Sequence, residues 1–322
     1  MEREKPVKLF KILRAGPLST IQDLGRNGYG QYGIPTAGAM DAWALQVANL
    51  LVGNQRYASG LEMTLRGIKA EILSSAVLAI TGGSGINTLN GKILNNWCTF
   101  KVEPGDVLDL GVITEGCRAY LSVSGGLDVP KVLGSDSTYV PALLGGLNGR
   151  SLIQEDIVFY QPNPKLSRPR RLAVNLLPHY PDVCTLRIIH GLHTELFSKE
   201  TLNLFYSTVY KVTAQSNRMG YRLDGRVLSL EKGAALVSDA VVFGAIQVPP
   251  DGQPIILAAD HQTTGGYPVI GVVASVDFSA LAQIRPGQRI RFHPIGIQEA
   301  QELYLGREKV LNILAGATGQ IT

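Results

Sequence analysis

Polar residues that could bind or transform a substrate are most concentrated at residues 260–268, DHQTTGGYP, directly after the apolar run PIILAA at residues 254–259. A site that stabilises negative charge on an amide-type oxygen needs hydrogen-bond donors fixed at that oxygen and a group that handles protons. Asp260 could accept a proton or orient a donor, and Thr264 offers a hydroxyl. The stretch therefore predicts a catalytic loop; the alternative is a hydrogen-bonded turn in which Asp260 caps its own loop.

The other residues of this stretch suit the recognition of an amide. Gly265 and Gly266 can adopt positive φ angles, which turn consecutive N–H groups toward an anion. Gln262 and Tyr267 can recognise an amide edge, and Thr263 adds a second hydroxyl.

Two further polar positions precede this loop. Arg218, which follows Asn217 in SNRMG, could hold a carboxylate or phosphate through two hydrogen bonds, or form a structural ion pair. Gln247, in AIQVP, alternates with apolar neighbours and so faces away from them, either into the same cavity or to the surface.

The first half of the chain has a compact polar set in which Asp23 and Arg26 could contact a protein partner or a substrate. Asp41 suits a helix cap or a catalytic acid, and Glu62 a buried ion pair or a site carboxylate. We predict catalytic roles for Asp260, Thr264, Tyr267 and Arg218, and substrate-binding roles for Gln262, Thr263, Gly265, Gly266, Gln247, Asn217, Arg26 and Asp23.

Several other motifs fail on their spacing. GGSGINTLNGK, at residues 82–92, resembles a phosphate loop, but five residues separate Gly85 from Gly91 and an isoleucine follows Lys92. HGLH, at residues 190–193, offers two histidines without a third ligand, which makes a poor zinc site. The three cysteines have no C-x-x-C spacing. We therefore expect no metal bound by this chain and a reducing, cytoplasmic location.

Composition excludes other classes of function. Only 17% of the 322 residues are charged, the formal charge is +4, and no long Lys/Arg block occurs beyond RPRR at residues 168–171. This argues against a nucleic-acid partner. The N-terminal segment lacks the apolar core of a signal peptide, and no apolar run approaches 18 residues. We expect a protein without a membrane partner.

Many short β-branched runs, separated by turn sequences, predict a mainly β chain built as barrels or sandwiches. The strands are expected in KAEILSSAVLAIT, CRAYLSVSGG, VCTLRIIHG, AALVSDAVVFGAIQVP and QRIRFHPI. Helical periodicity and end signals predict only a few helices, at residues 40–53, 198–207 and 296–308.

Two short sequence patterns occur twice in the chain, which indicates a duplicated unit. The pattern R-x-G-Y-x-x-x-G starts at Arg26 and again at Arg218, and GGLDVP is echoed by GAIQVP. The Pro- and Arg-rich residues 161–182 supply a natural boundary. We predict two domains, at residues 1–170 and 171–322.

At residues 19–41, STIQDLGRNGYGQYGIPTAGAMD, the chain resembles a family. Together with TAQSNRMGYRLDG, GAIQVPPDGQPIILAAD and HQTTGGYP, this stretch is similar to the second subunit of the allophanate-hydrolase and urea-amidolyase-related, biotin-dependent carboxyltransferase family. Its members are known as KipA and PxpC, the latter being the C subunit of 5-oxoprolinase. The resemblance extends from about residue 12 to residue 300.

The resemblance implies a pair of cyclophilin-like β-barrel domains with a few helices. It also implies an obligate KipI- or PxpB-like partner and, in the 5-oxoprolinase assembly, a PxpA-like partner. There are departures from the family pattern: Asp136 stands where relatives commonly have arginine, and Val269 replaces a frequent lysine or arginine beside TTGGYP.

Three functions are compatible with the resemblance. The first is the PxpC-type subunit of an ATP-dependent, ATP-hydrolysing 5-oxoprolinase, which opens the lactam of 5-oxoproline to glutamate. The second is a carboxyltransferase subunit that receives carboxybiotin from other chains and acts on a urea-like substrate. The third is a regulatory module that binds a KipI-like kinase inhibitor. We favour the first because this chain is not fused to a urea amidolyase, which makes it one component of an amide or lactam hydrolase that would use ATP at the level of the complex.

Overall fold

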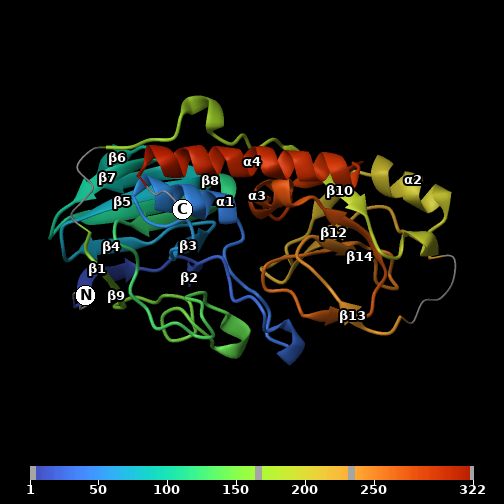
Figure 1. Cartoon of the computed structure of the whole chain (residues 1–322), viewed down its shortest axis with the longest axis horizontal. Helices are drawn as coiled ribbons and strands as arrows, with labels where there is room; N and C mark the ends of the chain where they lie inside the picture. Colours follow the sequence, from blue (N-terminus) through green and yellow to red (C-terminus); the bar gives the residue numbers. More distant parts are fainter. Residues whose placement is uncertain (1–4, 164–168, 231–235, 320–322) are drawn as a thin grey trace. The chain divides into compact units, whose positions relative to one another are not determined.

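The computed structural model describes residues 5–163, 169–230 and 236–319 (Figure 1). The chain divides into two compact units, one formed by residues 1–26, 41–179 and 309–322 and the other by residues 27–40 and 180–308. Residues 164–168, including the first arginine of RPRR, and residues 234–235 of a predicted strand lie outside the described residues. The domain boundary near residue 170 stays a prediction.

In its described residues, the first unit contains a nine-stranded sheet and one complete α-helix. The strands follow the order β2-β3-β8-β4-β1-β9, and β5 pairs with β8 and carries β6 and β7. Every pairing in this sheet is antiparallel. The elements are β1 (Val7–Arg14), β2 (Leu18–Gln22), α1 (Ala42–Leu51), β3 (Gly60–Thr64), β4 (Lys69–Ile72), β5 (Ala76–Leu89), β6 (Lys92–Leu94), β7 (Cys98–Val102), β8 (Val107–Val123) and β9 (Ile157–Tyr160).

The glycines of GGSGINTL lie inside strand β5, where the backbone of β8 comes close. A Cβ atom added to Gly85 would lie 2.0 Å from the carbonyl oxygen of Val112, and one added to Gly83 would lie 2.7 Å from Cγ2 of Ile113. The glycines therefore permit close strand pairing. This explains why a phosphate-loop-like composition occurs here without the phosphate-loop spacing.

Helix α1 forms where the sequence predicts it. The carboxylate of Asp41 accepts a hydrogen bond from the backbone nitrogen of Ala44 at 3.0 Å, so Asp41 is the N-cap. The helix ends before Gly53, which has a φ angle of 80°. Its buried face is nearly continuous from Ala44 to Leu51, as expected for a helix covered by the sheet of its own unit.

The second unit contains a closed barrel with the strand order β10-β17-β14-β15-β12-β11-β18 (Figure 1). The pairings are antiparallel except between β10 and β18, which are parallel. The elements are β10 (Val183–His190), α2 (Lys199–Ser207), β11 (Tyr210–Val212), β12 (Gly220–Asp224), β13 (Asp239–Ala240), β14 (Ala245–Gln247), β15 (Ile255–Leu257), β16 (Thr264–Gly265), β17 (Val269–Val273), α3 (Phe278–Ala282) and β18 (Arg289–Pro294). Helix α4 (Ile297–Ala317) begins in this unit, and its residues from 309 onward belong to the first unit. Strands β13 and β16 form a separate two-stranded sheet.

Apolar side chains fill the barrel, and a segment distant in sequence contributes to this core. Met40, from the segment 27–40, is fully buried among the barrel residues. Phe205 of α2 stacks on Phe292 of β18 with ring centroids 4.6 Å apart. This burial of aromatic and branched side chains is the main favourable term for the barrel.

The prediction of a mainly β chain with few helices and barrel-like units is confirmed. Helix α2 lies within the predicted residues 198–207, and its N-cap is Ser198, whose hydroxyl accepts a hydrogen bond from the backbone nitrogen of Thr201. The predicted end of α4 at residue 308 is too early, because the helix formers after it continue the helix to Ala317. The short helix α3 was not predicted. No helix in the described part of the chain is long and apolar enough to cross a membrane.

Candidate functional site

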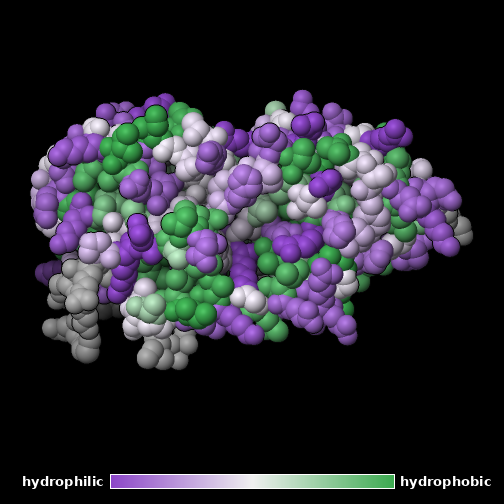
Figure 2. Space-filling view, turned by 90° about the horizontal axis from the view of Figure 1, so that it is seen from above, coloured by the Kyte–Doolittle hydropathy of each residue, from purple (hydrophilic) through white to green (hydrophobic). Residues whose placement is uncertain are grey.

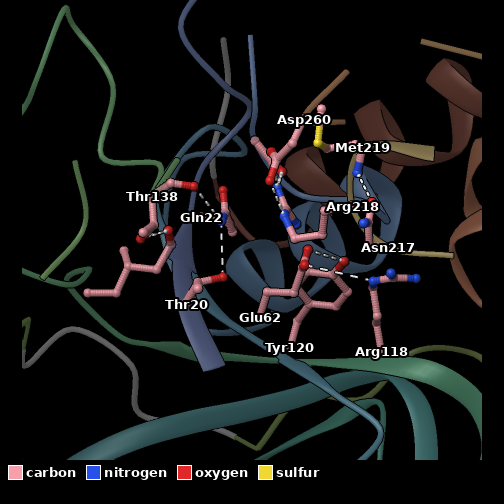
Figure 3. A network of polar contacts seen from close by, with 12 residues as sticks. Thr20, Gln22, Glu62, Arg118, Tyr120, Thr138, Asn217, Arg218, Met219 and Asp260 are labelled. Carbon is pink, nitrogen blue, oxygen red and sulfur yellow. Dashed lines mark hydrogen bonds and ion pairs between the residues drawn. The ribbon is translucent and has the colours of Figure 1, made fainter. Parts of the chain in front are cut away.

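Arg218 and Asp260 form a buried ion pair in the second unit (Figure 3). Arg218 Nε lies 2.9 Å from Asp260 Oδ2, and Arg218 Nη2 lies 2.9 Å from Oδ1. Arg218 is 6% exposed and Asp260 is 4% exposed. Two parallel N–H···O bonds of this kind fix orientation as well as adding attraction. The structure thus brings together two predicted catalytic residues that are 42 positions apart in the chain.

The ion pair joins three segments of the second unit. Arg218 Nη2 also donates to the carbonyl oxygen of Gly38 at 2.6 Å. The backbone nitrogen of Asp260 donates to the carbonyl oxygen of Arg218 at 2.8 Å. The pair therefore fixes the loop before β12, the loop after β15 and the segment 27–40. This arrangement suits a positioning role, since both charged groups are already engaged with each other.

Three predicted binding residues meet beside β14. Gln262 Nε2 donates to Gln247 Oε1 over a long 3.4 Å. A Cβ atom added to Gly265 would lie 2.4 Å from Gln247 Nε2. Gln247 is 2% exposed, so it is buried inside the protein and is not the surface glutamine of the alternative interpretation.

The expectation of positive φ angles at Gly265 and Gly266 is wrong. Neither glycine is among the residues with positive φ. Gly265 instead belongs to β16, where it pairs with Asp239 of β13 in extended conformation. A Cβ atom at this position would displace the amide end of the Gln247 side chain. The backbone does not form a left-handed anion-binding turn at this point.

The remaining predicted residues of this region lie nearer the surface. Thr264 and Gln262 are exposed, Thr263 is half-buried, and Tyr267 is 46% exposed. In the described part of the chain, no hydrogen bond connects Thr264 or Tyr267 with the ion pair. The exposed Asn217 accepts a hydrogen bond through Oδ1 from the backbone nitrogen of Met219 at 2.8 Å, and so stabilises its own turn (Figure 3).

His261, which was not selected from the sequence, is the buried titratable group beside Asp260. Its Nδ1 lies 2.6 Å from the carbonyl oxygen of Gln262, so Nδ1 donates and the lone pair of the neutral ring is on Nε2. Burial lowers the pKa of His261, against the opposing effects of the Gln262 hydrogen bond and the Asp260 charge. A neutral imidazole of this kind can accept a proton at neutral pH. The only feature of the sequence that points to His261 as a site residue is its position directly after Asp260.

In the first unit, Asp23 and Arg26 are engaged with their own unit. The Asp23 carboxylate accepts from the backbone nitrogens of Gly25 and Asp136 and from the hydroxyls of Ser135 and Ser137. Arg26, which is 1% exposed, donates to the carbonyl oxygen of Ser137. These contacts favour a role in fixing the 135–138 loop, and their substrate-binding role stays a prediction.

A second buried network of the first unit contains Glu62, which the sequence left open between an ion pair and a site carboxylate. Tyr120 Oη donates to Glu62 Oε2 at 2.7 Å and accepts from the backbone nitrogen of Asp41 at 2.8 Å (Figure 3). Arg118 Nε lies 3.9 Å from Glu62 Oε1. Burial, followed by the charges of Glu62 and Asp41, raises the pKa of Tyr120 well above its ordinary value. Tyr120 therefore stays protonated and supports Glu62 as a structural group.

An apolar groove of about 450 Å³ lies in the second unit along α4. Figure 2 views the side on which α4 lies in Figure 1 and shows hydrophobic residues at the surface between hydrophilic ones. The groove is lined by Ile189, Ser275, Ile297, Ala300, Gln301, Tyr304 and Leu305. None of these is a predicted site residue, and the lining offers no charged group for catalysis.

The described residues contain no group of three or more His, Cys, Asp and Glu side chains that could hold a metal ion. His193, one of the two histidines of HGLH, accepts a hydrogen bond through Nδ1 from the backbone nitrogen of Val269 at 3.2 Å. Its ring therefore supports the start of β17.

Known proteins resemble this chain over most of its length. It is 36% identical to the C subunit of 5-oxoprolinase from Escherichia coli (strain K12), over 95% of this chain and 98% of that protein. It is 34% identical to urea amidolyase of Lachancea kluyveri, over 95% of this chain but only 18% of that protein. The crystal structure of the K. lactis urea amidolyase superposes with a TM-score of 0.89 at 32% identity, covering 97% of this chain and 20% of that one. The model of the family "carboxyltransferase domain, subdomain A and B" matches residues 32–294, and the chain belongs to this family.

Proposed function

We propose that this chain is the PxpC-type subunit of an ATP-dependent 5-oxoprolinase complex, which converts 5-oxo-L-proline, ATP and water into L-glutamate, ADP and phosphate. The observation that carries this proposal is the extent of the match to the C subunit of E. coli 5-oxoprolinase, which includes 98% of that protein. A second relative of the same name, from Haemophilus influenzae, is matched over 94% of its length at 35% identity. The urea amidolyases, in contrast, are much longer chains.

In this proposal the chain acts with a KipI- or PxpB-like partner and a PxpA-like partner in the cytoplasm. None of the three cysteines, all of which lie in the described residues, forms a disulfide bond, which fits a reducing compartment. The stretch that comes nearest to a phosphate loop is part of β5, with the backbone of β8 against its glycines, so it does not fit ATP. We therefore assign ATP to the complex and derive no step of its chemistry from this chain.

The second unit supplies the residues that we propose for the reaction. Opening a lactam requires polarisation of its carbonyl oxygen and transfer of protons. The pair of Arg218 and Asp260 holds the catalytic loop in place. His261, neutral with its lone pair on Nε2, is the proton acceptor. The exposed hydroxyls of Thr264 and Tyr267 contact the substrate.

One observation favours a second function. The superposition with the K. lactis urea amidolyase supports a carboxyltransferase role in a urea-carboxylase-like enzyme. The chain has no A-M-K-M-like biotin attachment sequence, so carboxybiotin would have to arrive on another chain. A biotin carboxylase and a biotin carrier encoded beside this chain would support this alternative.

The deciding experiment is co-expression with the neighbouring PxpA- and PxpB-like proteins. We expect the purified complex to form ADP and glutamate only when 5-oxo-L-proline is present, and to lose this activity when this chain is omitted. Failure to turn over 5-oxo-L-proline with all three proteins present, together with urea-dependent carboxyl transfer after addition of a biotin carboxylase and carrier, would replace the proposal by the alternative.

A further inference from the structure

Gln247 carries a buried hydrogen-bond donor that has no partner in the part of the chain that the structure describes. It ends strand β14, where it pairs with Ile255 of β15 and with Val269 of β17. The register between β14 and β17 shifts next to Gln247, which is 2% exposed. Its Nε2 has no hydrogen-bond partner among the described residues.

A buried amide nitrogen without a hydrogen-bond partner is rarer in proteins than a buried oxygen without one. Among the described residues, Gln22 Oε1 and Asp136 Oδ1 are also buried without a partner, but both are acceptors. Arg14 Nε is a further buried donor without a partner, but its guanidinium already donates through Nη2 to Asp109 Oδ1 at 2.7 Å. Acceptors with a free lone pair are tolerated in protein interiors, whereas buried N–H groups without a partner are rare. Gln247 Nε2 presents two N–H groups, so a complementary acceptor from outside the chain would complete this site.

The residues around Gln247 fix the direction in which its Nε2 atom points. Gln262 Nε2 donates to Gln247 Oε1, which leaves Nε2 as the free end of the amide. Nε2 faces the Cα of Gly265 so closely that a Cβ atom there would lie 2.4 Å away. Gly265 thus keeps room for the amide although its own φ angle does not require glycine.

We propose that Gln247 is the residue that recognises the carbonyl oxygen of the substrate, by donating from Nε2 to an amide, lactam or ureido oxygen. This inference rests on the proposed function for the identity of the substrate but not for its chemical class, since an uncharged donor suits an uncharged carbonyl. Gln262 is a positioning residue that holds the amide in the donating orientation.

The ligand gains access when the short ladder between β13 and β16 opens. This ladder has two registered pairs, Asp239 with Gly265 and Ala240 with Thr264. Three of its four residues are exposed, and Gly265 is half-buried. So short a ladder costs little to separate, and its opening uncovers the donor that it shields in the free protein.

The first test separates binding from stability. Gln247→Met keeps the approximate volume but removes the donor. We expect the dissociation constant for the carbonyl ligand to rise at least about tenfold, while the melting temperature stays equal or rises, because an unpaired buried donor is lost. Gln46 supplies the control: its amide is paired on both sides, with Ala42 O at 3.1 Å and Arg56 Nε at 2.8 Å. Gln46→Met should lower the melting temperature and leave affinity unchanged.

Gly265→Ala tests the direction of the donor without changing Gln247. The new Cβ should displace the amide and weaken ligand binding to a similar extent as Gln247→Met. Gly296→Ala is the control, because a Cβ there meets nothing within 4 Å and its φ is not positive. Unchanged affinity in both Gln247→Met and Gly265→Ala would overturn the inference, as would a drop in the melting temperature of Gln247→Met that accounts for its loss of binding.

A reversible cross-link tests the opening. A disulfide in Ala240→Cys/Thr264→Cys joins two directly opposed residues. Under oxidising conditions it should abolish ligand binding, and reduction should return binding to the level of the Thr264→Cys single variant, because Thr264 itself contacts the substrate in the proposed function. The control is Lys211→Cys/Asp224→Cys, an opposed and exposed pair between β11 and β12. Full binding with the first ladder locked would overturn the proposed access.

The probes are 5-oxo-L-proline and urea, titrated calorimetrically into the full chain co-expressed with its PxpA- and PxpB-like partners. Binding of urea alone, lost in Gln247→Met, would disprove the proposed function and support this inference. Binding of 5-oxo-L-proline that is insensitive to both substitutions would support the proposed function and overturn this inference. If neither probe binds the wild-type complex at millimolar concentration, the inference is also overturned.

Discussion

Asp23 in the first unit and Gln247 in the second are both buried polar residues that the sequence predicts to bind a substrate, but their surroundings are opposite. The carboxylate of Asp23 accepts four hydrogen bonds from its own unit. The amide nitrogen of Gln247 donates none among the described residues. Asp23 is 7% exposed and Gln247 is 2% exposed, so burial alone does not separate them.

The difference indicates which of the two the fold needs. A buried group whose hydrogen bonds are complete contributes to stability, and its removal leaves several partners unpaired. A buried group with an unused donor costs stability and is retained for another reason. Asp23 should therefore behave as a structural residue, and Gln247 as a functional one.

The largest effect is expected at Asp23. Asp23→Ala removes the acceptor for two backbone nitrogens and two hydroxyls, so we expect the free energy of unfolding to fall by about 4 kcal/mol or more. The measurement is denaturant unfolding of the full chain. Asp251→Ala is the control, because Asp251 is exposed and its carboxylate accepts, among the described residues, one hydrogen bond, from Gln253 N at 3.0 Å. A loss at Asp23 no larger than at Asp251 would contradict the structural assignment.

Arg218 provides the next test, because its ion pair combines stability with the position of the loop. Arg218→Ala leaves Asp260 as an uncompensated buried charge, and we expect a loss of about 3 to 5 kcal/mol of stability. Replacing both residues, Arg218→Met with Asp260→Leu, should recover much of this stability but not the enzymatic activity. If the double variant kept full activity, the pair would have no role in positioning the loop.

The elements of the fold were predictable because their signals are local. Asp41 caps helix α1, which is one of its two predicted roles, and helix α2 forms within the predicted residues 198–207. The β-branched runs become the strands β10 and β18. The end of α4 was missed because no capping residue follows the periodic pattern at residue 308. The residues after it include helix formers, and these continue the helix to Ala317.

The candidate site was predictable in composition but not in geometry. Polar clustering identified Asp260, and a bidentate arginine was expected at Arg218, yet their mutual pairing depends on segments 42 positions apart. The conformation of Gly265 was wrongly expected, because the sequence does not reveal that Gln247 approaches it. His261 was missed because its burial, which lowers its pKa, is a property of the folded loop.

His261 predicts a pH dependence of intermediate size in the second unit. Burial lowers its pKa, so the unfolded chain takes up a proton near the ordinary value of about 6.5 while the folded chain does not. Stability should therefore fall as pH drops below about 6.5 until the folded pKa is reached. We expect His261→Gln to lose less stability than the wild type between about pH 7 and pH 5. His293→Gln, at an exposed position of β18, is the control, and a wild-type pH profile in His261→Gln would contradict the expectation.

The smallest effect is expected at Asp136, which contacts Asp23. The two residues allow a buried carboxylate with complete hydrogen bonds to be compared, within the described residues of the first unit, with one that has an unpaired oxygen. Its backbone nitrogen donates to Asp23, but its own Oδ1 has no partner among the described residues. Burial raises the pKa of Asp136, and the charge of Asp23 adds to this, against a hydrogen bond from Ser59. The ionised form is thus penalised in the folded chain, so stability is lost as pH rises through the interval between the unfolded pKa of about 3.9 and the higher folded pKa.

Asp136→Asn should accordingly raise the melting temperature slightly at pH 7, and this gain should shrink as the pH falls toward the ordinary pKa of about 3.9, because the raised pKa makes the folded chain take up the proton before the unfolded chain does. Asp156→Asn is a control of opposite sign. The hydrogen bond from Arg150 lowers the pKa of Asp156, with bonds of 2.7 and 2.8 Å between the two side chains, so this substitution should lower the melting temperature at pH 7. Melting curves of both variants from pH 4 to pH 7 decide between the two directions. If Asp136→Asn were destabilising at pH 7, the ionised Asp136 carboxylate would stabilise the fold together with Asp23. A buried atom without a hydrogen-bond partner would then no longer be a criterion for telling functional residues from structural ones in this protein.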